Sequence, residues 1–316
     1  MLGHEHGKGT WKISYRYMSM IMEGNLSGTD KVDDNYVFRH YIMSPHTMQM
    51  DMHMLMAMYG ISNRFSVMAM LNYNVSSMKM IMLPGSSHMH THGSSMVMSD
   101  PGSGEMVSHS SGFGDSKLYV VYTLLNRGIH HVFLSEGFSI PTGNIKVKGA
   151  SNDMMYTGDR LPYMMQLGSG SFDFMPGATY LLKTENTSFS LQLTSVIRPF
   201  SNSLGYHLGN EYTGNAWIAH KWLPWISTSL RAEGGYTEAI AGKDPELVQI
   251  LEPAANPFCY GGEYVSTYAG VNLFTTKGRM KNNKLSAEYG LPVYQALNGP
   301  QLGGRSIFSA SWLITF

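Results

Sequence analysis

Methionine occupies every even position from 48 to 58, and the odd positions between hold Gln49, Asp51, His53, Leu55 and Ala57. An α-helix would scatter these methionines around its circumference. Successive side chains of a β-strand instead point to opposite faces of the sheet. The segment therefore predicts a β-strand in which one face consists entirely of methionine, and the chain must provide a sheet that accommodates that face.

The segments on either side of this strand have the same two-residue period. Residues 10–23 place Trp11, Ile13 and Tyr15 on one face, and residues 64–82 do the same with Phe65 and Leu71. The opposite faces of these two segments carry methionines at Met18, Met20, Met22, Met68, Met70, Met78, Met80 and Met82. Consecutive strands joined by short turns are usually neighbours, with opposed Cβ atoms about 5 Å apart. Three adjacent strands are therefore predicted to share one sulfur-rich patch.

The alternation continues to the end of the chain. Further strands are predicted near 114–124, 132–141, 166–182, 188–199, 213–222, 226–238, 263–274, 284–294 and 305–316. Short links at 60–63, 125–130, 183–187, 223–225 and 275–283 alternate with long ones at 24–47, 83–112, 142–165, 201–212, 239–262 and 295–304. Twelve strands with short and long links in alternation are typical of an up-and-down transmembrane β-barrel of the bacterial outer membrane.

Composition agrees with a barrel wall that faces lipid. Charged residues make up 14% of the chain, against about 25% in soluble proteins. No apolar run reaches the roughly 18 residues of a transmembrane helix. The last strand places Phe308, Trp312 and the terminal Phe316 on one face. The resulting prediction is one barrel domain over residues 1–316, with a periplasmic segment at 1–9 and a His/Met-rich extracellular loop at 83–112.

Lipid selects the apolar face, so the charged face is expected to point into the barrel. This parity assigns to the interior Lys12, Arg16, Asp115, Lys117, Asp173, Arg198, Arg231, Glu233 and Glu288. Charges of both signs are expected to pair there and to keep the wall rigid. Glu136 departs from the scheme because it shares parity with Leu134 and Phe138. A β-bulge that shifts the register is the expected reason.

The interior methionines suggest three roles. Thioethers bind soft ions such as Cu(I), so the candidate metal ligands are Met48, Met50, Met52, Met54, Met56, Met58, Met18, Met20, Met22, Met68, Met70, Met78, Met80 and Met82. His88, His90 and His92 would capture the metal at the extracellular mouth. Methionine is also a flexible apolar side chain, which equally favours passage of small apolar or aromatic solutes. The third alternative is a structural outer-membrane protein without transport. No cofactor is required, and copper is the one metal to consider.

Other functional classes find little support in the sequence. Basic and acidic residues number 22 each, so bulk charge gives no reason to expect nucleic-acid binding, and the expected partner is outer-membrane lipid. The single Cys259 cannot form an internal disulfide. Ser139 and His130 are a poor catalytic pair, and no nucleophile-elbow motif is present. An enzyme is therefore not predicted. The chain opens MLGHEH without an export leader, so we expect this numbering to describe a processed or trimmed chain.

Several stretches resemble a known family of outer-membrane barrels, the phenol meta-pathway degradation-like group of transporters. The matching pieces, in order, are GTWKISYRYMSM, GTDKV, MQMDMHMLMAMYG, SNRFSVMAMLNYN, SGFGDSKL, SIPTGNI, LPYMMQLGSGSFDFMPGATYL and AEYGLPVYQALNGPQL. They span nearly the whole chain. The resemblance implies a barrel with a channel and a role in the uptake of aromatic compounds. It assigns no binding residue and does not choose between an aromatic solute and copper.

Overall fold

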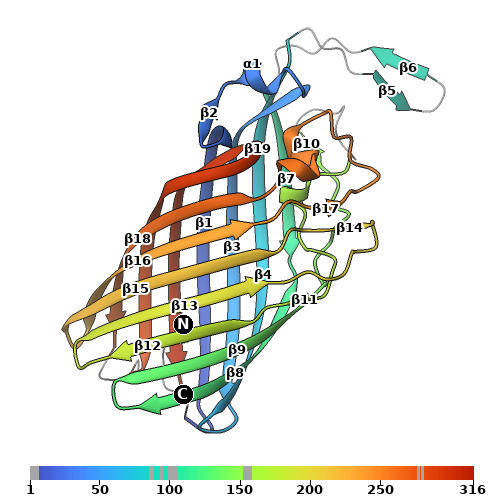
Figure 1. Ribbon diagram of the computed structural model, residues 1–316. Coiled ribbons are helices and arrows are strands. Elements are labelled where there is room, and N and C mark those ends of the chain that lie inside the picture. Colours follow the sequence, from blue (N-terminus) through green and yellow to red (C-terminus); the bar gives the residue numbers. More distant parts are fainter. Residues whose placement is uncertain are drawn as a thin grey trace.

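The computed structural model describes residues 7–84, 89–92, 95–98, 105–151, 159–275, 278 and 281–316. It is a closed antiparallel β-barrel, as the sequence predicted (Figure 1). Eleven strand elements form the wall: β1 (Trp11–Gly28), β3 (Met43–Gly60), β4 (Phe65–Met82), β8 (Ser116–Arg127), β9 (His130–Ile140), β12 (Gly177–Lys183), β13 (Thr187–Val196), β15 (Glu211–Leu223), β16 (Ile226–Thr237), β18 (Gly262–Phe274) and β19 (Asn283–Thr315).

The remaining elements are short and lie mostly at one end of the barrel. They are β2 (Asp30–Val32), α1 (Asp34–Val37), β5 (Met89–His92), β6 (Ser95–Met98), β7 (Glu105–Phe113), β10 (Ala150–Ser151), η1 (Tyr163–Met165), β11 (Asp173–Phe174), β14 (Tyr206–His207), β17 (Ala241–Gly242), η2 (Pro253–Ala255) and η3 (Pro257–Cys259). Among the residues that the structure describes, no helix has the length and hydropathy needed to cross a membrane.

Strand β19 crosses the wall twice. Residues 284–297 pair with β18, whereas residues 301–315 pair with β1 and run in the opposite direction. The two halves lie side by side, because the Gln295 amide bonds Gly304 and the Thr315 N–H donates to the Asn282 carbonyl. The two last predicted strands, 284–294 and 305–316, are these halves. Each of the twelve predicted crossings therefore has a counterpart in the wall.

Two predicted boundaries are wrong. The predicted strand 166–182 begins only at Gly177, because residues 166–172 belong to a loop that the structure anchors elsewhere. The predicted loop 83–112 contains β7. Strands β7 and β8 both pair with β4, one after the other along its length, and Gly114 and Asp115 separate them. The polar sequence EMVSHSSGF gave no apolar alternation to reveal this strand.

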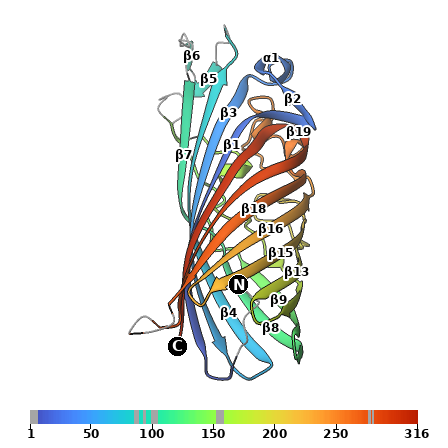
Figure 2. The same cartoon turned by 90° about the vertical axis from the view of Figure 1, so that its left-hand side faces the viewer.

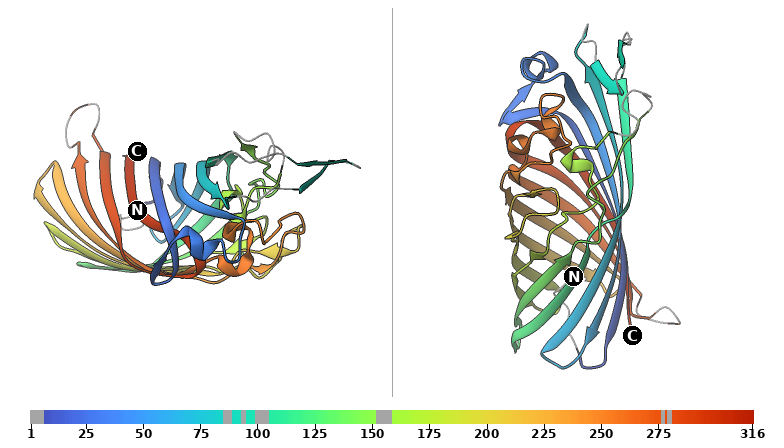
Figure 3. Two further views of the ribbon diagram at one scale, coloured as in Figure 1. Left: turned by 90° about the horizontal axis from the view of Figure 1, so that it is seen from above. Right: turned by 90° about the vertical axis from the view of Figure 1, so that its right-hand side faces the viewer.

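The two ends of the barrel differ as predicted. Short turns join strands at 61–64, 128–129, 184–186, 224–225 and 275–282, and all other links lie at the opposite end (Figure 2). The barrel closes next to the short turns, where the Phe316 N–H donates to the Trp11 carbonyl at 2.9 Å. Short turns and paired terminal strands mark the periplasmic end of bacterial barrels. Viewed from the other end, the long links gather over one side of the opening (Figure 3).

The outer surface of the wall is apolar. Trp11, Tyr15, Phe65 and Leu71 are exposed, while Lys12 and Ser14 on the opposite parity are buried. Exposed apolar side chains on alternate positions of every long strand are what a lipid-facing wall requires. The predicted parity of the faces is therefore confirmed for these strands.

Glu136 stays on the outer face. It opposes Val120 of β8, which is exposed, and its neighbours Leu134 and Phe138 are exposed as well. A β-bulge does interrupt the pairing of β8 with β9, but at Thr123 and Leu125, so it does not turn Glu136 inward. The bulge explanation is wrong, and one Glu136 carboxylate oxygen is buried without a hydrogen-bond partner in the described chain.

Candidate functional site: the methionine face and the barrel interior

The register aligns methionines across β1, β3 and β4. Met22, Met48 and Met78 oppose one another directly, which makes a triad across three neighbouring strands. Five further pairs are aligned in the same way: Met18 with Met52, Met20 with Met50, Met43 with Met82, Met56 with Met70, and Met58 with Met68. All of these lie on the inward face. The predicted sulfur-rich patch on three adjacent strands is thus present as a contiguous surface, which we call the methionine face.

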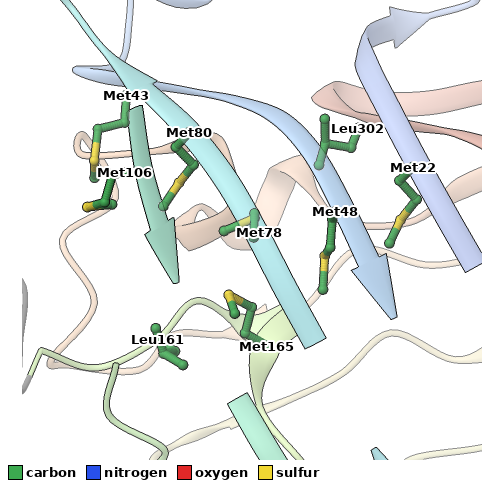
Figure 4. Close-up of a cluster of buried hydrophobic side chains, with 9 residues drawn as sticks. All are labelled: Met22, Met43, Met48, Met78, Met80, Met106, Leu161, Met165 and Leu302. Atoms are coloured by element: carbon green, nitrogen blue, oxygen red, sulfur yellow. The ribbon is translucent and has the colours of Figure 1, made fainter. Parts of the chain in front are cut away.

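The extracellular half of the methionine face is not open. Met48 and Met78 are each 1% exposed, and they belong to a buried cluster formed by Met22, Met43, Met48, Met78, Met80, Met106, Leu161, Met165 and Leu302 (Figure 4). Met165 and Leu161 do not belong to the wall. They come from the link 141–172 between β9 and β11, whose described residues 141–151 and 159–172 fold inward and place these two side chains against the wall methionines. We call these described residues the inward loop.

The carboxylate of Asp115, at the break between β7 and β8, anchors both ends of the inward loop. It accepts hydrogen bonds from the Gly143 N–H at 2.9 Å and from the N–H and hydroxyl of Ser169 at 2.7 and 2.8 Å. Gly143 and Gly168 approach so closely that a Cβ on either would lie within 3 Å of the other's backbone. The sequence placed Asp115 in the interior correctly, but not as an anchor.

A side-chain amide ties the middle of the inward loop together. Gln166 accepts from the Val147 N–H at 2.9 Å and donates to the Leu161 carbonyl at 2.6 Å. Val147 and Met164 then pack against the buried methionine cluster. The loop therefore has an ordered, hydrogen-bonded structure, and its apolar side chains face the wall. Adjacent Met164 and Met165 in a Gly/Ser-rich link are the sequence signal that could have indicated this contact.

A second link covers the same region from the extracellular side. Arg160 of the inward loop forms a buried ion pair with Asp244 at 3.4 Å and a second with Glu246 at 2.7 Å, both in link 238–261. Leu251 of that link packs against the methionine cluster. Glu252 beside it is buried, one of its oxygens has no partner in the described chain, and burial raises the pKa of this carboxyl to about 8.

The periplasmic half of the interior contains a cavity of about 570 Å³. Its lining comes from the inner faces of β12, β13, β15, β16, β18, β19 and β1, with the turn after β12. It includes charged residues, serines and Trp217, but none of the described methionines. The cavity is therefore polar, and among the strands of the methionine face β1 contributes to its lining, through Arg16.

Five of the charges predicted for the interior, Asp173, Arg198, Arg231, Glu233 and Glu288, form ion pairs. Arg231 donates to Glu233 at 2.6 Å and to Glu288 at 3.3 Å, and its guanidinium stacks 3.6 Å from the ring centroid of Tyr268. On the other side of the barrel, Arg198 pairs with Asp173 at 3.4 Å and with Glu211 at 2.8 Å. The Arg231–Glu288 pair spans from β16 across β18 to β19, the Arg198–Glu211 pair connects the end of β13 with β15, and the Arg231–Glu233 pair lies within β16.

The other predicted site residues fall into three groups. Met58 and Met68 are buried, and the partly buried methionines of the methionine face are Met18, Met20, Met50, Met52, Met54, Met56, Met70 and Met82. His88 lies outside the described residues, and for His90 and His92 only the backbone of the β5–β6 hairpin is described. The described part of the chain contains no group of three or more His, Cys, Asp or Glu side chains suited to a metal ion. The histidine capture site therefore stays a prediction.

The one Ser/His pair considered for catalysis is not assembled. Ser139 is buried on the inner face of β9, whereas His130 is exposed at the periplasmic end of the same strand and bonds the Tyr180 hydroxyl at 2.8 Å. Nine residues of extended chain and opposite parity separate the two side chains. This pair cannot provide a nucleophile and its base.

Comparison with known proteins supports the fold. No family model and no curated protein matches the chain. The crystal structure described as the COG4313 outer membrane channel from Pseudomonas putida F1 has a TM-score of 0.63 at 15% identity, over 99% of this chain and 98% of that one. A Pseudomonas aeruginosa FadL homologue (TM-score 0.45, 11% identity, 97% and 90% covered) and the KdgM porin (0.43, 8%, 96% and 99%) are more distant.

At these identities the likeness concerns the fold, and the resemblance to phenol meta-pathway barrels stays a prediction. The closed barrel and its apolar outer face are nevertheless those of a bacterial outer-membrane protein, as predicted. The chain shares its architecture with the COG4313 outer membrane channel over nearly the full length of both chains.

Proposed function

We propose that this barrel is a channel for small, largely apolar solutes, and that contact between the inward loop and the methionine face closes its extracellular half. The observation that carries the proposal is the buried cluster, in which Met165 and Leu161 of the loop cover Met48 and Met78 of the wall. Thioether side chains have three rotatable bonds and repack at low cost. A contact made of them can part around an apolar solute and close again.

The inward loop allows a direct test by cross-linking. In a Cys259→Ser background, Met78→Cys and Met165→Cys would be joined by a bis-methanethiosulfonate reagent, which fixes the loop to the wall. Uptake of N-phenyl-1-naphthylamine by porin-deficient cells that express the protein would be followed by fluorescence. We expect cross-linking to reduce uptake to the level of cells without the barrel, and reduction of the linker to restore it.

Each single-cysteine variant, treated with the same reagent, controls for labelling alone. If the cross-linked protein conducts as fast as the unlinked one, the contact is not the closing element. If wild-type cells take up the probe no faster than cells without the barrel, the protein is not a channel for this class of solute.

A soft metal ion is the second candidate ligand, and the triad Met22, Met48 and Met78 favours it. Three thioethers directly opposed on adjacent strands are the donor set that Cu(I) prefers. Purified protein would compete for Cu(I) with bathocuproine disulfonate. We expect Met22→Leu/Met48→Leu/Met78→Leu to lose retention, because leucine has nearly the same volume but no donor atom. The matched control is Met20→Leu/Met54→Leu/Met82→Leu. If both variants retain the same amount of Cu(I), the triad is not the binding site. If wild type retains no Cu(I), the protein does not bind copper.

A further inference from the structure

The polar cavity in the periplasmic half carries an excess of positive charge. Its lining includes Arg16, Lys183, Lys221, Arg231 and Lys284 on the basic side, and Glu185, Glu233 and Glu288 on the acidic side. Two of the three acids are already used, since Glu233 and Glu288 both accept from Arg231. A third hydrogen-bond acceptor, Asn215, also binds Arg231, at 2.9 Å. Arg231 and the two glutamates are therefore already paired with one another.

Arg16 has no comparable partner. It lies on the inner face of β1, opposite Met54 of β3 and Ser311 of β19. Within the described part of the chain its guanidinium makes no hydrogen bond or ion pair, and its Nε atom is buried and unsatisfied. The part of the side chain that remains accessible faces the cavity. A guanidinium withdrawn from bulk water without an acceptor carries a cost that an anion in the cavity would remove.

Lys284 is a second unpaired cation on the same cavity. Its ammonium group has no ion pair among the described residues, and it lies over the Phe274 ring, 5.5 Å from the ring centroid. Lys284 and Arg16 are close enough for their charges to repel each other, and Glu288, which attracts both, is held by Arg231. Two cations that face one cavity in this way are a preformed anion site.

The rest of the lining indicates which anions fit. Trp217, Phe274 and Leu313 also line the cavity, together with serines of β16 and β19. These apolar surfaces suit the body of an organic molecule, and the two cations suit its charged end. Arginine binds carboxylate and sulfonate oxygens through its planar array of N–H donors, and inorganic phosphate shares this chemistry.

We propose that Arg16 and Lys284 form a binding subsite for the acidic end of a small amphipathic organic acid within the barrel. This inference rests on the proposed channel function and specifies its solute class: an apolar body that passes the methionine face and an anionic group that is held in the periplasmic cavity.

The subsite can be tested by binding alone, without any transport. Radiolabelled benzenesulfonate would be equilibrated by dialysis against the full-length protein in detergent. We expect saturable binding to wild type, at least about tenfold weaker binding to Arg16→Gln and to Lys284→Gln because each loses a charge-assisted contact, and partial recovery with Arg16→Lys. Arg64→Gln, on a periplasmic turn outside the cavity, is the matched control and should bind as wild type does. Heat-modifiable mobility in gels verifies that each variant is folded.

Competition distinguishes the solute classes. Neutral benzenesulfonamide should not displace the label, and inorganic phosphate should displace it only weakly because it lacks an apolar body. The inference is overturned if both glutamine variants bind as tightly as wild type or if benzenesulfonamide competes equally. It is also overturned if phosphate competes as well as the organic acid, which would indicate a simple phosphate site. The dialysis assay measures binding and not transport. A protein that binds benzenesulfonate but transports no solute would therefore contradict the proposed channel function without contradicting the subsite.

Discussion

At the scale of single residues, the choice of methionine over leucine is what the buried cluster explains. Met48, Met78 and Met165 are almost completely buried between a rigid wall and a loop. Leucine would fill the same volume but with fewer accessible rotamers, whereas methionine adapts to an irregular and changeable surface. At the periplasmic end Met58 and Met68 are buried as well, whereas Met54 and Met56 in the middle are only partly buried. Packing therefore accounts for the two ends of the methionine face better than for its middle.

Replacement of Asp115 by alanine should release the inward loop. The substitution removes the acceptor of three hydrogen bonds and leaves the buried N–H of Ser169 and the partly buried N–H of Gly143 without partners. We expect the loop contact to weaken by about 3 kcal/mol, since hydrogen bonds to charged groups contribute roughly 1.5–3 kcal/mol each. Limited proteolysis within 141–172 and single-channel conductance should both increase. Asp159→Ala, which removes an exposed carboxylate from the same loop, should change neither. Unaltered proteolysis of Asp115→Ala would show that the anchor is dispensable.

At the scale of elements, the break at Gly114 and Asp115 organises the interior. Strand β8 pairs with both β4 and β9, but β7 beyond the break pairs with β4 and with the short β10 of the inward loop. The chain between β9 and β12 is therefore free to leave the wall and enter the barrel. One polar residue at the break then holds both ends of that loop.

The link 238–261 should respond to pH through Glu252. Burial raises the pKa of this carboxyl to about 8, so the packed link holds it neutral. An exposed glutamate ionises near pH 4.3. The stability of the packed form is therefore complete below that pH and is lost progressively as pH rises toward 8. Hydrogen exchange of 238–261, corrected for intrinsic rates, should show this loss in wild type but not in Glu252→Gln.

Glu185→Gln, on a periplasmic turn, is the control for this measurement and should follow wild type. A loss of protection in Glu252→Gln as large as in wild type would assign the pH response to another group.

At the scale of the whole molecule, closure of the barrel is the condition for its residence in lipid. Residues 301–315 of β19 pair with β1 on one side and with residues 284–297 on the other. Every backbone N–H and C=O group in the hydrocarbon must be paired, because each unpaired group costs several kcal/mol there. The second crossing of β19 thus pairs with both the edge of β1 and the edge of the first crossing of β19.

Deletion of residues 305–316 should abolish assembly. Residues 12–21 of β1 would lose their partner residues 306–315 of β19, and this side of β1 would expose an unpaired strand edge to lipid. We expect no heat-modifiable species and no protein in the outer-membrane fraction, checked by fractionation and gel mobility. Ser309→Thr/Ser311→Thr keeps the strand and its outward face and should assemble normally. A stable truncated barrel in the membrane would contradict this account.

The sequence alone determined the twelve crossings and the inward and outward faces of their strands, because alternation of period two depends only on local backbone geometry and on the contrast between lipid and interior. It also placed the methionines of three consecutive strands side by side. Only the tertiary structure decided what those methionines touch. The inward loop, the anchor at Asp115 and the unpaired Arg16 all depend on contacts between segments far apart in the chain, and a hydrophobic or polar pattern carries no information about such partners. The methionine face that the alternation predicted is therefore present, but in its extracellular half it is covered by a loop.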